Sequence, residues 1–128
     1  MTYTHDRILK DTAMPEAEQR VRDALQAEGF GVLTEIDVKA TMKQKIDKEM
    51  DDYLILGACN PKMAWEAMKL EPRIGAMLPC NVILRSVDGA TEVSAVDPVA
   101  SMSAVDNPEL HAFAGEVRDM LVRAVDAA

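Results

Sequence analysis

Residues 78–97 read LPCNVILRSVDGATEVSAVD, and this stretch decides the fold. Two apolar runs, Leu78–Ser86 and Thr91–Asp97, flank the pair Asp88-Gly89, which is a strong signal for a two-residue hairpin turn. The turn fixes which residues face each other across the two strands. The expected cross-strand pairs are Arg85 with Glu92, Leu84 with Val93, and Val82 with Ala95. One charge pair and two apolar pairs agree with the turn, so we predict an antiparallel hairpin.

Three further segments have strand patterns. Tyr53–Cys59 is apolar on both faces, which predicts a buried central strand. Residues 30–37 alternate and predict a half-buried strand. Its expected inward face is Phe30, Val32, Thr34 and Ile36. Tyr3–Leu9 is polar and irregular, and we interpret it as an edge strand.

Helical spacing of apolar residues marks four segments. The first runs from about 15 to 28, with Pro15 in its first turn and Gly29 just past its end. The second follows Asp37 as its N-cap and carries a narrow apolar stripe between lysines. That stripe is Val38, Met42, Ile46 and Met50. Asn60-Pro61 and Asn107-Pro108 each place a cap before a proline at the first helical position, and the last helix is expected to reach about 126.

The order of these elements is strand, helix, strand, helix, strand, helix, strand, strand, helix. This order predicts an α+β fold in which helices pack on a mixed β-sheet of about five strands. The length of 128 residues fits one domain with a single core, so we expect residues 1–128 to form one unit. No linker or internal repeat interrupts the pattern.

Charge and hydropathy limit the classes of partner and the cellular compartment that we expect for this chain. The formal net charge is −8 and the pI about 4.7, so we expect neither nucleic acid nor an anionic membrane surface as a partner. The sequence contains no run of about 18 apolar residues, so we expect no membrane span. The first ten residues do not resemble a secretory signal. Two cysteines are too few for a disulfide scaffold. A cytoplasmic location is the resulting expectation.

The two cysteines stand in similar settings, Cys59-Asn60-Pro61 and Pro79-Cys80-Asn81. Cys59 precedes a predicted helix start, where free backbone N–H groups favour an anion and lower a thiol pKa. Cys80 falls on the apolar face of the hairpin opposite Asp97, where burial and a carboxylate both raise a thiol pKa. If either thiol is reactive, we expect it to be Cys59.

The sequence gives only weak signals for a disulfide, a metal site or a catalytic acid. A disulfide between Cys59 and Cys80 needs their strands to run antiparallel, or a partner subunit to fold over, and the sequence leaves this open. The chain has only two histidines, no paired Cys-x-x-Cys and no phosphate-binding glycine loop. We therefore expect no metal and no cofactor. Glu71 can face a pocket or form a surface ion pair with Arg73.

Four motifs in order resemble the domain-of-unknown-function family 302. The segments are Gly29–Asp37, Ile55–Pro61, Glu71–Val82 and Ala95–Pro98, and together they cover about 29 to 98. The resemblance implies a small standalone α+β domain that forms a homodimer and has no established activity. It marks the same Cys-Asn segments together with Glu71 and Asp97 as motif positions.

Three functional hypotheses remain. The first is a cytoplasmic homodimeric domain that binds a small ligand or a partner at a shared pocket. The expected lining residues are Cys59, Asn60, Cys80, Asn81, Asp97 and Glu71. The second is a thiol-dependent oxidoreductase in which Cys59 attacks and Cys80 resolves. The third is a structural interaction domain that uses the apolar helix around Trp65 as its contact surface.

Overall fold

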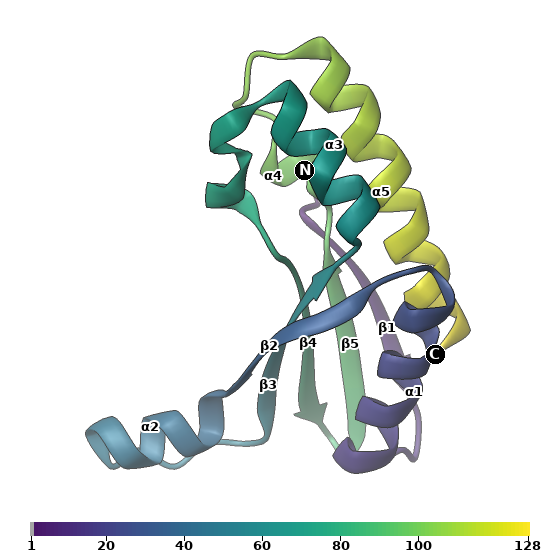
Figure 1. Cartoon of the computed structure of the whole chain (residues 1–128). Helices are drawn as coiled ribbons and strands as arrows, with labels where there is room; N and C mark the ends of the chain where they lie inside the picture. Colours follow the sequence, from purple (N-terminus) through teal and green to yellow (C-terminus); the bar gives the residue numbers. More distant parts are fainter. Residues whose placement is uncertain (1) are drawn as a thin grey trace.

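The computed structural model describes residues 2–128 and has a five-stranded sheet in the order β1-β5-β4-β3-β2 (Figure 1). The strands are β1 (Thr4–Leu9), β2 (Gly31–Asp37), β3 (Tyr53–Cys59), β4 (Cys80–Val87) and β5 (Ala90–Val96). The α+β class and the number of strands are confirmed. The sheet is antiparallel between all neighbours rather than mixed. The connection from β3 to β4 returns at the same end of the sheet, so it does not produce a parallel crossover.

The predicted hairpin register is confirmed at each of its three cross-strand pairs. Asp88 and Gly89 form the two-residue turn with positive φ values of 46° and 80°, the left-handed backbone that such turns require. Arg85 Nε donates to Glu92 Oε1 at 2.7 Å across the strands. The hairpin is therefore fixed by turn chemistry and by pairing together.

Two long helices cover one face of the sheet. They are α1 (Met14–Ala27) and α5 (Pro108–Ala127), and the main core lies between them and the sheet (Figure 1). The remaining helices are α2 (Val38–Ile46), α3 (Pro61–Leu70), the 3₁₀ helix η1 (Pro72–Met77) and α4 (Pro98–Ser101). A smaller core joins α3, η1, α4 and α5 at the end of the sheet where β3 finishes.

The strand β2 contains a bulge that the sequence pattern does not reveal. Val32 pairs with Ala58 and Thr34 with Gly57, so Leu33 is an extra residue between two neighbouring pairs. An extra residue breaks the strict alternation of faces along a strand. Val32 therefore packs against the main core, whereas Thr34 and Ile36 face away from it and are exposed. The expected single inward face of residues 30–37 is wrong for this reason.

The helix α2 projects from the body beyond one end of the sheet (Figure 1). No residue of α2 is buried. Asp47, in the left-handed conformation, ends the helix one turn earlier than the stripe through Met50 suggests. Among the described residues, no helix is long and apolar enough to cross a membrane.

Candidate functional site

The antiparallel register brings the two Cys-Asn segments to the same end of the sheet. Cys80 pairs directly with Ala58, the residue before Cys59. Cys59 ends β3, and Asn60 begins α3, which covers this end of the sheet. Both Cys-Asn segments therefore lie near the same apolar region within a single chain.

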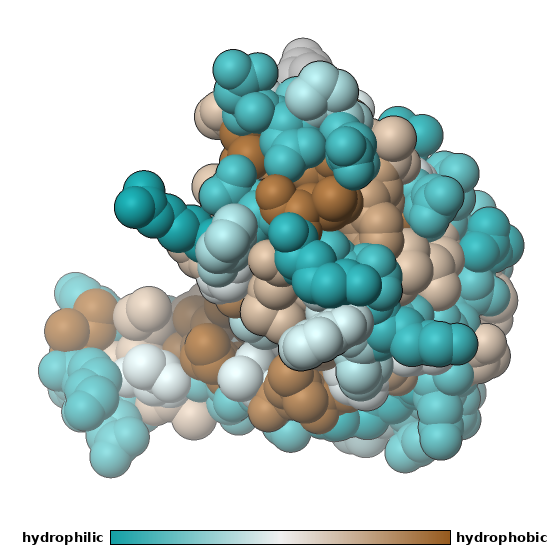
Figure 2. Space-filling view, turned by 45° about the horizontal axis from the view of Figure 1, so that its top comes forward, coloured by the Kyte–Doolittle hydropathy of each residue, from teal (hydrophilic) through white to brown (hydrophobic). Residues whose placement is uncertain are grey.

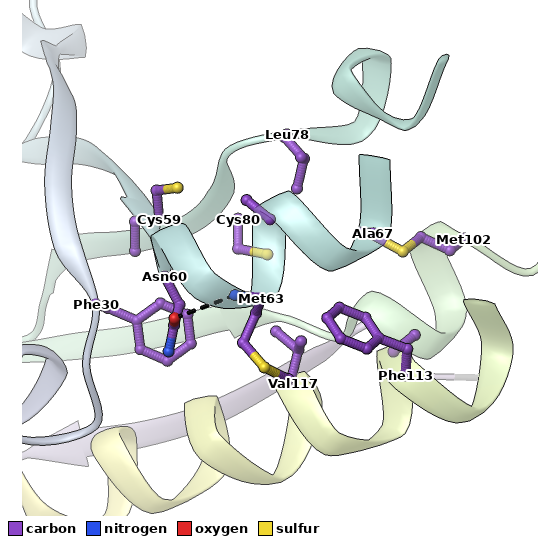
Figure 3. A pocket seen from close by; sticks show the side chains of 13 residues that line it. Phe30, Cys59, Asn60, Met63, Ala67, Leu78, Cys80, Met102, Phe113 and Val117 are labelled. Carbon is purple, nitrogen blue, oxygen red and sulfur yellow. Dashed lines mark hydrogen bonds between the residues drawn. The ribbon is translucent and has the colours of Figure 1, made fainter. Parts of the chain in front are cut away.

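A cavity of about 30 Å³ lies beside these segments, at the seam between the two cores (Figure 3). Its walls come from the ends of β3 and β4, from α3 and α5, and from the segment just after α4. The lining residues are Phe30, Ala58, Cys59, Asn60, Met63, Ala64, Ala67, Leu78, Cys80, Met102, Phe113, Ala114 and Val117. Several of them, such as Met63 and Phe113, are partly exposed, so the cavity is close to the surface. Its lining is almost wholly apolar.

Cys80 is buried, with an exposed fraction of 6 %, and it belongs to the main core. Burial, followed by the nearby Cys59 thiol, raises the pKa of Cys80 from 9.0 to about 11. The predicted direction is confirmed, and burial is the predicted cause. The carboxylate of Asp97 is not a cause, because that side chain caps a helix instead of facing the thiol. At neutral pH, Cys80 is an uncharged thiol.

Cys59 lies one position out of register with Cys80. Successive residues of a strand point to opposite faces, and Ala58 shares the face of Cys80, so Cys59 falls on the other face. Figure 3 shows the two sulfur atoms pointing in different directions. Both cysteines are free thiols. The antiparallel arrangement thus brings the strands together without bringing the two thiols into a cross-strand pair.

The carboxamide of Asn60 is occupied by two hydrogen bonds within the chain. Its Oδ1 accepts from Met63 N at 3.4 Å and caps α3, as the sequence predicts. Its Nδ2 donates to Glu28 O at 3.4 Å and ties α3 to the end of α1. Gly29, with φ of 87°, leaves room for this carboxamide, because a Cβ there would lie 3.0 Å from Nδ2. The carboxamide of Asn60 therefore holds the start of α3 in place beside the cavity, and both of its polar atoms are already hydrogen-bonded.

Three of the six residues expected at the pocket lie elsewhere. Asn81 is exposed and follows Cys80 on the opposite face of β4. Asp97 Oδ1 accepts from Val99 N at 2.9 Å and starts α4. Glu71 separates α3 from η1, where its backbone oxygen accepts from Ile74 N at 3.0 Å. The expected lining thus forms around Cys59, Asn60 and Cys80.

Sequence reasoning missed the cavity residues supplied by the helices. Phe113, Ala114 and Val117 come from α5, and Met102 from the segment after α4. The apolar spacing of the last helix marked Phe113 and Val117 as core residues, but a spacing does not show where core packing leaves a gap. Within the described chain, no group of three His, Cys, Asp or Glu side chains is placed to hold a metal ion.

Comparison with known proteins agrees with this architecture. The model of the family described as "Domain of unknown function DUF302" matches residues 7–128. The chain belongs to the DUF302 family. It is also similar to the crystal structure of an uncharacterized conserved DUF302 protein from Bacillus stearothermophilus, with a TM-score of 0.93 and 24 % sequence identity over 99 % of this chain and 98 % of that one. No curated protein matches the chain. The DUF302 resemblance predicted from the four motifs is confirmed.

Proposed function

We propose that this DUF302 chain is a binding domain for a small apolar molecule, or for the apolar end of a larger one. The supporting observation is the position and chemistry of the cavity beside Cys59 and Cys80. Its polar groups are few: the Asn60 carboxamide is already hydrogen-bonded, and the Cys80 thiol is held uncharged. Such a lining offers contact area and shape, but no charge to a ligand.

The size of the cavity limits how a ligand enters. A volume of about 30 Å³ holds little more than one water-sized group. A larger ligand requires side chains to move, and Met63 and Met102 are suited to this, since methionine has three flexible torsions and a polarizable sulfur. We infer that ligand binding repacks these methionines between α3 and α5.

Titration of isotope-labelled protein with xenon, benzene and indole tests this function. We expect the methyl resonances of Ala114 and Val117 to shift saturably with at least one of these probes, because both residues line the cavity. Labelling of Cys80 by a small methanethiosulfonate should slow in parallel.

A matched pair of variants locates the binding. Ala64→Leu adds volume to a partly exposed cavity residue, whereas Ala112→Leu adds it to an exposed position of α5 outside the cavity. We expect the first variant to weaken probe binding about tenfold or more and the second to leave it unchanged. Saturable binding that is equally strong in both variants, or no binding to the unchanged chain, would contradict the proposal.

The same proposal includes a cytoplasmic location. Its support is that the fold is held together without a disulfide between Cys59 and Cys80, which fits a reducing compartment. Fractionation of cells that express the chain without added leader sequences tests this, and recovery outside the cytoplasm would refute it.

A further inference from the structure

Four sulfur-bearing side chains line the cavity beside the ends of β3 and β4. They are Cys59, Cys80, Met63 and Met102. Thiolate and thioether sulfur atoms are soft ligands, and together they suit Cu(I). Within the described chain no group of three His, Cys, Asp or Glu side chains could hold a metal ion, but that leaves a sulfur site open, because two of these four side chains are thioethers.

The size and the chemistry of the cavity favour a single soft ion over a water molecule. Its volume of about 30 Å³ is enough for one water-sized group. A buried water needs about two to four polar partners. The side chains of the wall do not supply them, since both polar atoms of the Asn60 carboxamide are already hydrogen-bonded. The remaining donor atoms of the lining side chains are sulfur.

Cys80 is placed to be the anionic ligand. Its exposed fraction is 6 %, and Figure 3 shows its sulfur directed into the space between the side chains of Met63 and Met102. In the empty cavity, burial raises the pKa of this thiol to about 11, so the thiol is protonated at neutral pH. When the Cu–S bond forms, the S–H bond breaks and the proton leaves to solvent, while copper stays in the +1 state.

The charge balance selects a monovalent ion. No Asp, Glu, His, Lys or Arg lines the cavity, so Cys59 is its only other titratable side chain. Cys59 points to the opposite face of β3 from Cys80 and does not supply a second thiolate. One thiolate with Cu(I) is neutral, and the two thioethers add no charge. A divalent ion on the same ligands would leave an uncompensated charge in an apolar wall, which is costly.

We propose that the cavity is a Cu(I) site whose ligands are the Cys80 thiolate and the Met63 and Met102 thioethers. Both methionines can turn their sulfur atoms inward, because their side chains have three flexible torsions. The site is close to the surface, since Met63 is partly exposed. Figure 2 brings this end of the molecule forward, and apolar side chains reach the surface there between hydrophilic ones. The copper site shares the cavity with the proposed apolar ligand but does not depend on that ligand.

Anaerobic titration of the chain with Cu(I), in competition with bicinchoninate, tests the site. We expect a single Cu(I) per chain and an ultraviolet thiolate-to-copper charge-transfer band. Cys80→Ser should remove the band and weaken binding about a hundredfold or more, because it removes the only anionic ligand. No binding to the unchanged chain would overturn the proposal. So would binding that Cys80→Ser keeps and Cys59→Ser abolishes, since the outer thiol would then hold the metal.

A matched pair of methionine variants tests the thioether ligands. Met63→Leu keeps the apolar volume but removes the sulfur atom, so it should weaken Cu(I) binding about tenfold or more. Met68→Leu is the control, because Met68 lies on the same helix, is 41 % exposed and does not line the cavity. It should leave the affinity unchanged, and circular dichroism of both variants checks folding. Equal affinities of the two variants would contradict the proposed ligand set.

The two proposals for this cavity can fail separately. Met63→Leu should still bind xenon or benzene, because these probes need the space and not the sulfur atom. If the unchanged chain binds the apolar probes but no Cu(I), the copper site alone is refuted. If it binds Cu(I) at Cys80 and none of the apolar probes, the copper site stands and the apolar-ligand proposal is refuted.

Discussion

Gly57 shows how a single residue allows two strands and a loop to meet. It lies in β3 on the face opposite the core helices, where Thr34 and Pro79 approach it. A Cβ at this position would overlap Thr34 Oγ1 and lie 2.6 Å from Pro79 Cγ. The proline ring is rigid, so the second overlap cannot be relieved by rotation of a flexible side chain. The absence of a side chain at residue 57 is therefore required for the close approach of the segment before Cys80.

We predict that Gly57→Ala destabilises the chain by about 1–3 kcal/mol, the typical cost of overpacking. Gly115→Ala is the control, because Gly115 lies in α5 with nothing within 4 Å of its Cβ position. That change should stabilise the chain by about 0.5–1 kcal/mol, since glycine is unfavourable within a helix. Urea unfolding of both variants measures the difference. Equal effects from the two substitutions would show that the contact with Pro79 is unimportant.

At the scale of the element, three helices begin in the same way. Asn60-Pro61, Asp97-Pro98 and Asn107-Pro108 each combine a side-chain cap with a proline at the first helical position. The pattern predicted α3 and α5 from the sequence. The same pattern also stands at the start of α4, which is only four residues long. We did not predict α4, because a single helical turn has no apolar periodicity. Capping residues mark where helices start but give little information about their length.

The two asparagine caps differ in the quality of their hydrogen bonds. Asn107 Oδ1 accepts from Leu110 N at 3.1 Å, and its Nδ2 donates to Leu70 O at 3.0 Å. Both bonds of Asn60 are longer, at 3.4 Å. We predict that Asn107→Ala costs about 1–2 kcal/mol of stability and Asn60→Ala less, because loss of a well-formed cap costs more. Thermal or urea unfolding checks the order, and a larger loss from Asn60→Ala would disprove it.

At the scale of the whole molecule, burial of one thiol links stability to pH. The pKa of Cys80 is about 11 in the folded chain and 9.0 as its ordinary value, so the unfolded chain loses this proton first as pH rises. The contribution of Cys80 to stability is therefore complete below pH 9 and decreases as pH rises towards and beyond 11. The expected loss is about 1.4 kcal/mol by pH 10, from the linkage relation.

The comparison with Cys80→Ala isolates this effect. Tyrosine and lysine titrations affect both proteins alike, so the difference in free energy of unfolding between the two should decrease from pH 8 to pH 10. The change in packing contributes a constant offset to that difference. A difference that does not vary with pH would show that Cys80 titrates near its ordinary pKa in the folded chain.

The sequence by itself determined the hairpin and its register. Asp88-Gly89 favours a two-residue turn, and the length of that turn fixes which residues of the two strands face each other. It also determined the four longer helices, the central strand and the family, since local spacing, caps and motifs carry that information. The bulge at Leu33 was not predictable, because an alternating pattern reads the same whether or not one residue is skipped in pairing.

Only the tertiary structure decided how these elements combine around Cys59 and Cys80. The direction and the register of β3 against β4 depend on how the connection through α3 and η1 packs, and the register places Cys80 opposite Ala58 rather than Cys59. The packing at this end of the sheet also leaves the Asp97 carboxylate as the cap of α4 and brings α5 to the cavity. Such placements depend on contacts between residues far apart along the chain, and neighbouring residues alone do not specify them.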